Sequence, residues 1–324
     1  MAVVFEGWKL PMKTFLQTIL LVIVLSGFGY LVVKYRLQLG SFVNHCDAKT
    51  AILIIGLSGA TILIDIVRVV LLFRILGFTQ PLLKFFVVIT ATTAVSYSLG
   101  GKIGLPIRMH WQKKYCNIPY SVSAACMGIE TVFGYLFMAA TILVSLPFVK
   151  MQVPKTIVVT VLGIAVLFLI ALSLMQLWPE HTERPKGFVA RIRAEIRRVL
   201  ARFPASILTQ CGIALLFCFV LGSFVTAIRL HLQMKCLGLR SDTFTLYVID
   251  LFSYFVSSFW ILPGGLGAKE ASLALLLRGI SIPADAALVF AIADRIITTG
   301  LSICIGLCCL PFLNRKQTNG KTLS

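Results

Sequence analysis

The chain alternates between long apolar stretches and short polar connections. Eight stretches are apolar over the length that a bilayer-spanning helix needs, about 20 residues. They cover about 14–33, 51–73, 82–99, 121–149, 156–178, 206–230, 244–262 and 285–313. The pattern predicts an all-α polytopic membrane protein in which residues 1–324 form a single integral membrane domain.

The composition excludes the soluble classes of protein. Hydrophobic residues make up 58% of the 324 residues and charged residues only 13%, about half of the roughly 25% that is usual in soluble domains. A soluble fold of this length still exposes much of its surface, so its core would be too small to bury all of these apolar residues. We therefore exclude a soluble enzyme and a disordered chain.

One segment has a different pattern from the eight stretches. Between Gly187 and Phe203 the apolar residues share one helical face, and arginines occupy the other. The predicted element is a basic amphipathic helix over 186–204, lying on the cytoplasmic membrane surface. The chain has a net charge of +18. This charge is explained by basic loops and this helix facing anionic lipid headgroups, so we expect no nucleic-acid partner.

The sequence also contains an internal repeat. Gly100-Gly101, Ile118-Pro119 and Glu130 recur 164 residues later as Gly264-Gly265, Ile282-Pro283 and Asp294. With an offset of 161, Arg68, Arg74 and Gly77 match Arg229, Lys235 and Gly238. We therefore expect two copies of one unit, at about 50–149 and 206–313.

Loop charge distinguishes two topologies for these copies. If all eight stretches cross the membrane, the Lys and Arg residues divide at best 16 to 11 between its sides. If 82–113 and 244–278 are re-entrant hairpins with Gly-Gly tips, the cytoplasmic side holds 18 and the outer side 9. This topology fits the positive-inside rule better. It gives inverted repeats with about six full transmembrane helices, although 244–262 is long enough to cross.

Each Gly-Gly tip precedes a predicted half-helix, 102–113 in the first copy and 267–277 in the second. The N-terminus of such a helix offers unpaired N–H groups to a phosphate, and glycine allows close approach. Alternatively, the glycines only allow tight helix packing. The candidate binding residues at the tips are Gly100, Gly101, Lys102, Arg108, Gly264, Gly265, Gly267 and Lys269, with Glu270 as a local counter-ion.

Ionisable residues inside the apolar stretches form a second set of candidates. A charge at bilayer depth costs at least about 2.5 kcal/mol, so it has a function or a neutralising partner. Asp65 and Arg68 are three residues apart, which predicts a structural ion pair. Glu130 and Asp294 lie at matching depth in the two copies, and with Arg295 they are the stronger binding candidates.

The chain carries no catalytic signature. It lacks the zinc-protease, nucleophile-elbow, P-loop and dinucleotide motifs. Its four histidines show no metal-ligand spacing, and most of its nine cysteines lie in apolar stretches, where cysteine packs as a small hydrophobe. We expect no enzymatic activity, no cofactor and no metal.

The segment from Leu262 to Ala271, followed by Ile282-Pro283 and Asp294-Arg295, resembles the signature of the lysylphosphatidylglycerol synthase transmembrane (flippase-like) family. Gly100–Arg108 with Ile118-Pro119 and Glu130 is similar to that family's first Gly-rich loop. The resemblance implies a multi-pass protein of the inner (plasma) membrane that moves polar lipids between leaflets. The chain would be a stand-alone member without an aminoacyl-transferase domain.

These features lead to a hypothesis with two alternatives. The leading one is a flippase-like protein whose partners are membrane phospholipids with anionic headgroups. An ion-coupled transporter of a small polar solute would use Glu130 and Asp294 equally well. The third is a non-transporting scaffold that binds lipid-synthesis enzymes or copies of itself.

Overall fold

A computed structural model describes residues 32–75, 77–99, 101–149, 205–258 and 267–318, together with residues 26, 29, 30 and 163. Most of the predicted stretch 14–33 and nearly all of 156–178 lie outside these residues, and the amphipathic helix 186–204 lies wholly outside them. Within the described residues every regular element is a helix and there is no strand, so the all-helical prediction is confirmed there.

The helices follow the predicted apolar stretches and half-helices, apart from the helix at Arg36–His45, which the sequence pattern did not predict. They are α2 (Arg36–His45), α3 (Ala48–Ile75), α4 (Leu82–Leu99), α5 (Gly101–Cys116), α6 (Tyr120–Ser145), α9 (Ala205–Cys236), α10 (Thr243–Ser258), α11 (Ala268–Arg278) and α12 (Ala284–Thr318), with a short 3-10 turn at Leu146–Phe148. Ala48–Ile75, Tyr120–Phe148, Gly212–Cys236 and Ala284–Leu313 are long and apolar enough to cross a membrane. Shorter apolar helices lie at Leu82–Tyr97 and Thr243–Ser257.

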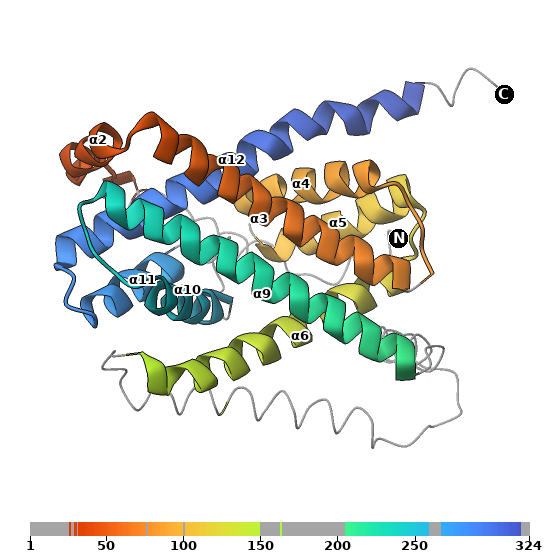
Figure 1. Cartoon of the computed structure of the whole chain (residues 1–324). Coiled ribbons are helices and arrows are strands. Elements are labelled where there is room, and N and C mark those ends of the chain that lie inside the picture. The colour runs from red at the N-terminus through yellow and green to blue at the C-terminus, as the bar shows by residue number, and fades with distance from the viewer. Residues whose placement is uncertain are drawn as a thin grey trace, which may run out of the picture.

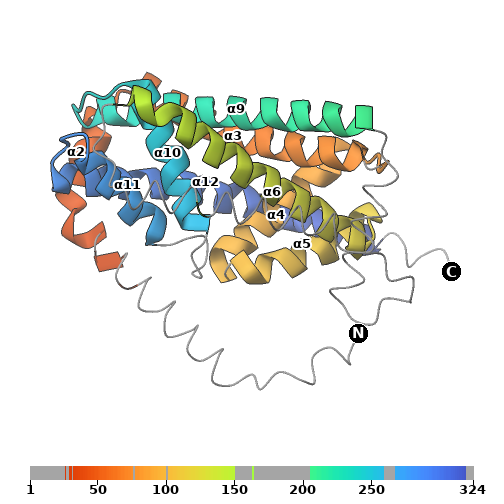
Figure 2. The ribbon, with the colours of Figure 1, turned by 90° about the horizontal axis from the view of Figure 1, so that it is seen from below.

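Helices α3 and α9 form the central pair. They lie side by side and run in opposite directions (Figure 1). A Cβ atom on Gly222 would lie 3.5 Å from Ile64, and Arg68 faces the ring of Phe219 at 4.3 Å. Residue numbers therefore increase along α3 as they decrease along the adjacent part of α9, which is the contact pattern of antiparallel helices. Helix α6 crosses this pair obliquely (Figure 2).

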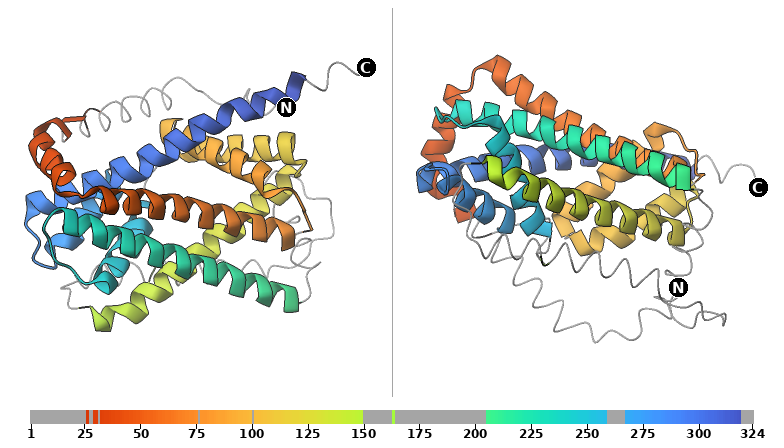
Figure 3. Two further views of the ribbon diagram at one scale, coloured as in Figure 1. Left: turned by 45° about the horizontal axis from the view of Figure 1, so that its top comes forward. Right: turned by 60° about the horizontal axis from the view of Figure 1, so that its bottom comes forward.

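Both predicted hairpin segments form two helices that pack on each other, α4 on α5 and α10 on α11. At Gly104 an added Cβ would lie 1.7 Å from Ser96 Oγ, so α5 folds back directly against α4. Helix α12 packs on both hairpins, on α11 near its start and on α4 farther along (Figure 3). Gly306 allows the second contact, because a Cβ there would lie 2.5 Å from the Thr90 carbonyl oxygen. Re-entry of the hairpins into the membrane stays a prediction.

Turns at the matched positions have the same geometry. Gly77 follows α3 with φ +82° and Gly238 follows α9 with φ +66°. The next amides, of Phe78 and Leu239, donate to carbonyls five residues earlier. This is the glycine-terminated cap in which a left-handed residue satisfies the last carbonyls of a helix.

A second pair of turns also matches. Asn117 has φ +54° and Ser281 φ +67°. Each precedes an Ile-Pro pair, whose proline carbonyl accepts the first backbone bond of the next helix, from Ser123 in α6 and from Ala287 in α12. Outside glycine such backbone angles are uncommon, and both occur 164 residues apart.

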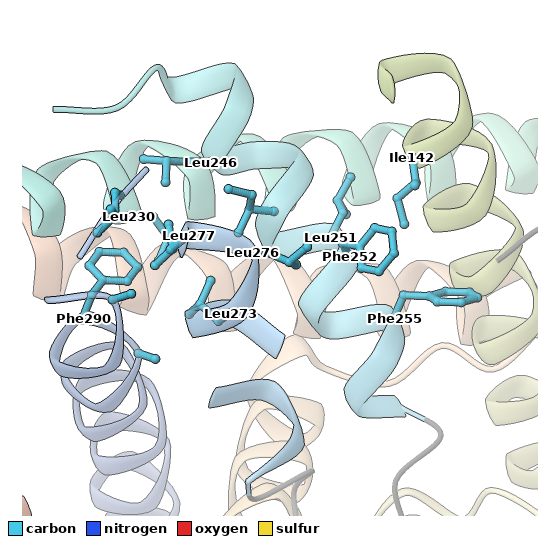
Figure 4. Close-up of a cluster of buried hydrophobic side chains, with 14 of the residues drawn as sticks. Ile142, Leu230, Leu246, Leu251, Phe252, Phe255, Leu273, Leu276, Leu277 and Phe290 are labelled. Carbon is cyan, nitrogen blue, oxygen red and sulfur yellow. The ribbon is translucent and has the colours of Figure 1, made fainter. Parts of the chain in front are cut away.

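Two apolar cores lie at opposite ends of the central pair. One joins α10 and α11 to the C-terminal half of α9 and to α6 and α12, with Leu230, Phe252, Leu277 and Phe290 buried in it (Figure 4). The other joins α4 to the C-terminal half of α3, the start of α6 and the end of α12. Each core supports one hairpin, and the charged side chains described next lie on the same helices.

Candidate functional site

The first charge cluster lies on α3, α5 and α6. Arg68 Nη1 is 3.0 Å from Asp65 Oδ1, which confirms the predicted ion pair. The same guanidinium also donates to Glu130 Oε1, from Nη2 at 2.8 Å and from Nε at 3.2 Å. Arg108 Nη2 lies 3.7 Å from Glu130 Oε2. Asp65, Arg68, Arg108 and Glu130 are called the α3–α6 cluster below.

The α3–α6 cluster is only partly shielded. The side chains of Arg68 and Glu130 are each 16% exposed, whereas that of Asp65 is 60% exposed. The Arg68 guanidinium also faces the ring of Phe219 on α9, a cation–π contact that adds to its fixation. Arg68 is therefore held by groups from three helices, and it acts as the centre of this cluster.

The second charge cluster lies on α9, α10, α11 and α12. Arg229 donates to Asp294, and each side chain is only 2% exposed. Lys269 Nζ lies between two carboxylates, 3.6 Å from Asp294 and 3.5 Å from Asp250. Arg295 Nε is 3.1 Å from Glu270 Oε1. Arg229, Asp250, Lys269, Glu270, Asp294 and Arg295 are called the α9–α12 cluster below.

Glu270 has a second contact that closes the start of α11. Its Oε2 accepts the N–H of Gly267 at 2.8 Å, so the side chain caps its own helix. Gly267 has φ +84°, a conformation that glycine adopts without the Cβ penalty. An acidic cap stabilises the positive end of the helix. The N-terminus of α11 thus already holds a carboxylate at the place where the sequence predicts a phosphate.

Both clusters are balanced in charge. The α3–α6 cluster joins two arginines to two carboxylates, and the α9–α12 cluster joins three cations to three carboxylates. Buried charges are stable at membrane depth only when they are paired. Because the balance leaves no surplus positive charge, an anionic ligand has to compete with the carboxylates for the cations.

A small cavity adjoins the α3–α6 cluster, and a tyrosine in its wall faces the α9–α12 cluster. The cavity has a volume of about 100 Å³ and is lined by Asp65 of α3, by Thr93 and Tyr97 of α4 and by Ser302 of α12, among others. The Tyr97 ring also faces the Arg295 guanidinium at 5.5 Å. Tyr97 thus touches the second cluster and lines the same cavity as Asp65 of the first.

The structure brings together most of the predicted site residues that it describes. Arg108 meets Glu130, and Lys269, Glu270, Asp294 and Arg295 belong to one cluster. Glu130 pairs with Arg68 and Arg108. Gly101 is the first residue of α5. Gly100, Gly264, Gly265 and the side chain of Lys102 lie outside what the structure describes.

Sequence reasoning did not include Arg68, Arg229 and Asp250 among the binding candidates. The 161-residue offset already matched Arg68 with Arg229, and that was the available signal. In the structure each of these arginines pairs with the matched acid of its own copy, Glu130 or Asp294. Within the described residues, no group of three or more His, Cys, Asp or Glu side chains is placed to hold a metal ion.

A family model described as the lysylphosphatidylglycerol synthase TM region matches residues 18–306. The match covers both charge clusters and both hairpin segments. No curated protein and no solved structure matches the chain.

Proposed function

Because the chain belongs to the family of lysylphosphatidylglycerol synthase transmembrane regions, we propose that it moves polar phospholipids between the leaflets of the cell's inner (plasma) membrane. This activity needs no bond to be made or broken. The observation that carries the proposal is the presence of two charge clusters at matched positions of two antiparallel helices. Charged groups at membrane depth are expensive to retain even when they are paired, and their recurrence at matched positions favours a path for a polar substrate.

The fold supports an inverted repeat as the framework for transport. Equivalent arginines lie on α3 and α9, which run in opposite directions, and equivalent turns follow both helices. Two inverted copies place similar binding groups toward opposite faces of a membrane, which is the arrangement that alternating access uses. The loop charges agree, since hairpins that enter from opposite sides give the better positive-inside distribution.

Arg108 is the best-placed headgroup contact in the first cluster. It contacts Glu130 only through Nη2, at 3.7 Å. Its Nε is buried and has no hydrogen-bond partner among the described residues, and an unpaired buried donor costs about 1–3 kcal/mol. A phosphate oxygen satisfies such a donor and forms charge-assisted bonds with a guanidinium. In the second cluster we assign the same role to Lys269.

The cost of binding an anionic headgroup is the displacement of a carboxylate. In the α9–α12 cluster Lys269 is shared by Asp250 and Asp294, so a phosphate that binds Lys269 leaves one of these acids with less compensation. Protonation of that acid restores the balance. The same feature favours a second candidate function, an ion-coupled transporter in which these carboxylates carry the proton.

The test is lipid translocation by the full-length protein in liposomes. Fluorescent phospholipids with anionic or zwitterionic headgroups report movement between leaflets, and a pH-sensitive dye in the lumen reports proton flux. Arg108→Gln removes the charge of the proposed contact. The matched control is Arg278→Gln, which removes an exposed charge at the end of α11.

We expect the wild-type protein and Arg278→Gln to translocate lipid at similar rates. Arg108→Gln should be at least tenfold slower, because losing a charge-assisted bond of about 1.5–3 kcal/mol changes a rate by tenfold or more. If wild-type vesicles move lipid no faster than empty ones, the proposal is wrong. Proton or solute flux without lipid movement would support the second candidate. The absence of both activities would support a scaffold.

A further inference from the structure

Two cysteines that are far apart in sequence meet at one end of the central helix pair. Cys46 follows the last residue of α2, and Cys236 is the last residue of α9. Their Sγ atoms lie 2.8 Å apart, closer than the roughly 3.5–4.0 Å at which unbonded carbon atoms pack. Sulfur is the larger atom, so nothing lies between the two side chains.

The side chains that pack around this cysteine pair are mainly apolar, although Asp47 follows Cys46 directly in the sequence. Cys236 is 4% exposed and packs with Phe42, Ile54 and Ala293, while Cys46 is partly exposed at the edge of the same group. A structural zinc site needs four ligands, usually Cys or His, and the described residues do not gather three such groups with carboxylates included. The pair therefore suits a bond between its two sulfurs better than a metal ion.

The predicted topology places this pair on the outer side of the membrane. The basic segment 186–204 precedes α9 and is predicted to be cytoplasmic, so α9 carries Cys236 to the opposite side. Helix α3 runs antiparallel to α9, and Cys46 at its start reaches the same side. Compartments on the outer side of cellular membranes are oxidising, whereas cytosolic thiols are kept reduced.

We propose that Cys46 and Cys236 form a disulfide bond in the mature protein. The oxidant is a disulfide-bonded thiol oxidase or a small-molecule disulfide of the outer compartment. The more exposed Cys46 attacks the oxidant as a thiolate and forms a mixed disulfide, which releases one thiol of the oxidant. Cys236 then attacks Cys46 Sγ and releases the second. Two electrons and both thiol protons pass to the oxidant, which leaves as two thiols.

The bond links two segments that are separated by 190 positions. It fixes the start of α3 to the end of α9 on one side of the membrane, while the opposite ends of these helices stay free. A cross-link over such a separation restricts the unfolded chain strongly. The disulfide therefore stabilises the central pair and limits how far α3 and α9 can separate at the outer face.

The experiment counts free thiols in the full-length protein. Cells are lysed in detergent with excess N-ethylmaleimide, so that free thiols are blocked before any exchange. The protein is then reduced, labelled with a heavier maleimide and measured by intact mass and by peptide mapping. Cys46→Ser and Cys236→Ser are the test variants, and Cys304→Ser, which removes an exposed thiol of α12, is the matched control.

We expect the heavy label on Cys46 and Cys236 in the wild-type protein and in Cys304→Ser. In each test variant, the remaining cysteine of the pair should carry the light label instead, because its free thiol reacts with N-ethylmaleimide at lysis. Reductant should lower the unfolding temperature of the wild type to that of Cys46→Ser and leave this variant unchanged.

If both Cys46 and Cys236 carry the light label in the wild-type protein, the disulfide is absent and the proposal is wrong. The thiol count is independent of lipid translocation, so it is informative whether or not the proposed transport function holds. A membrane-impermeant reductant that opens the bond from the outer side alone would also support the predicted topology.

Discussion

The buried pair of Arg229 and Asp294 should be the most sensitive point of the fold. Both side chains are 2% exposed, and removal of one partner from such a pair typically costs about 3–5 kcal/mol. In Arg229→Ala, Asp294 keeps Lys269 at 3.6 Å, so we expect the lower end, about 3 kcal/mol. At about 1.4 kcal/mol per factor of ten, the folded-to-unfolded ratio should fall more than a hundredfold.

The matched pair in the first cluster provides an internal comparison. Arg68 and Glu130 are more exposed, 16% each, and the Asp65 side chain is 60% exposed. Arg68→Ala should therefore cost less, about 1.5–3 kcal/mol, the range for hydrogen bonds to charged groups. Arg240→Ala removes an exposed charge between α9 and α10 and should change stability by no more than about 0.5 kcal/mol.

The assay is reversible unfolding in mixed micelles, followed by tryptophan fluorescence, for each single variant. The double variant Arg229→Leu with Asp294→Leu removes both charges and leaves Lys269 with Asp250. It should be more stable than either single variant, because an apolar pair avoids the uncompensated charge. The reasoning is refuted if Arg229→Ala is as stable as the wild type. It is also refuted if the double variant loses as much free energy of unfolding as its two single substitutions lose together.

Three other changes test the site, the packing and the topology. Asp250→Asn should strengthen the binding of anionic lipid several-fold, because it leaves Lys269 less compensated; lipid co-purification measures this. Gly306→Ala should destabilise the fold by about 1–3 kcal/mol, since its Cβ would lie 2.4 Å from the Ala94 Cβ; thermal unfolding measures this. Single cysteines at 113–115 and 278–281, in a background without native cysteines, should be labelled from the cytoplasmic and the outer side respectively.

The first two of these tests have a control in the same chain. Asp242→Asn removes a carboxylate that caps the start of α10, outside both clusters, and should not change lipid binding. Gly300→Ala places its Cβ in open space, so helix propensity should make it neutral or stabilising. Equal lipid binding by Asp250→Asn and the wild type, equal stability of Gly306→Ala and Gly300→Ala, or labelling of both loops from one side would contradict the respective expectation.

Local features were predictable from the sequence because they depend on neighbouring residues. The stretch 82–99 has the same bounds as α4, and the prediction 51–73 lies within α3. Asp65 and Arg68 are three residues apart on one helix, so their ion pair follows from helix geometry alone. Gly77 and Gly238, matched by their offset, both end helices with a left-handed residue.

Contacts between helices were not predictable in the same way. Arg68 and Glu130 are 62 positions apart, and Arg229 and Asp294 are 65 apart. Which charges meet depends on the rotation of each helix about its axis and on where helices cross, which packing contacts such as Gly306 against α4 decide. The repeat related each charged residue to its equivalent in the other copy. It did not show which charged residues of one copy contact each other.

The exposure of the two clusters suggests a direction for the proposed mechanism. The α9–α12 pair is nearly sealed, whereas Asp65 of the α3–α6 cluster is 60% exposed. In an inverted repeat the two clusters exchange roles when the molecule changes state, because each copy takes the conformation of the other. Under this proposal the described conformation has the more exposed first cluster and the more enclosed second cluster. The opposite state requires the buried Arg229–Asp294 pair to become accessible, so a lipid phosphate that pairs with Arg229 offsets part of the cost of opening it.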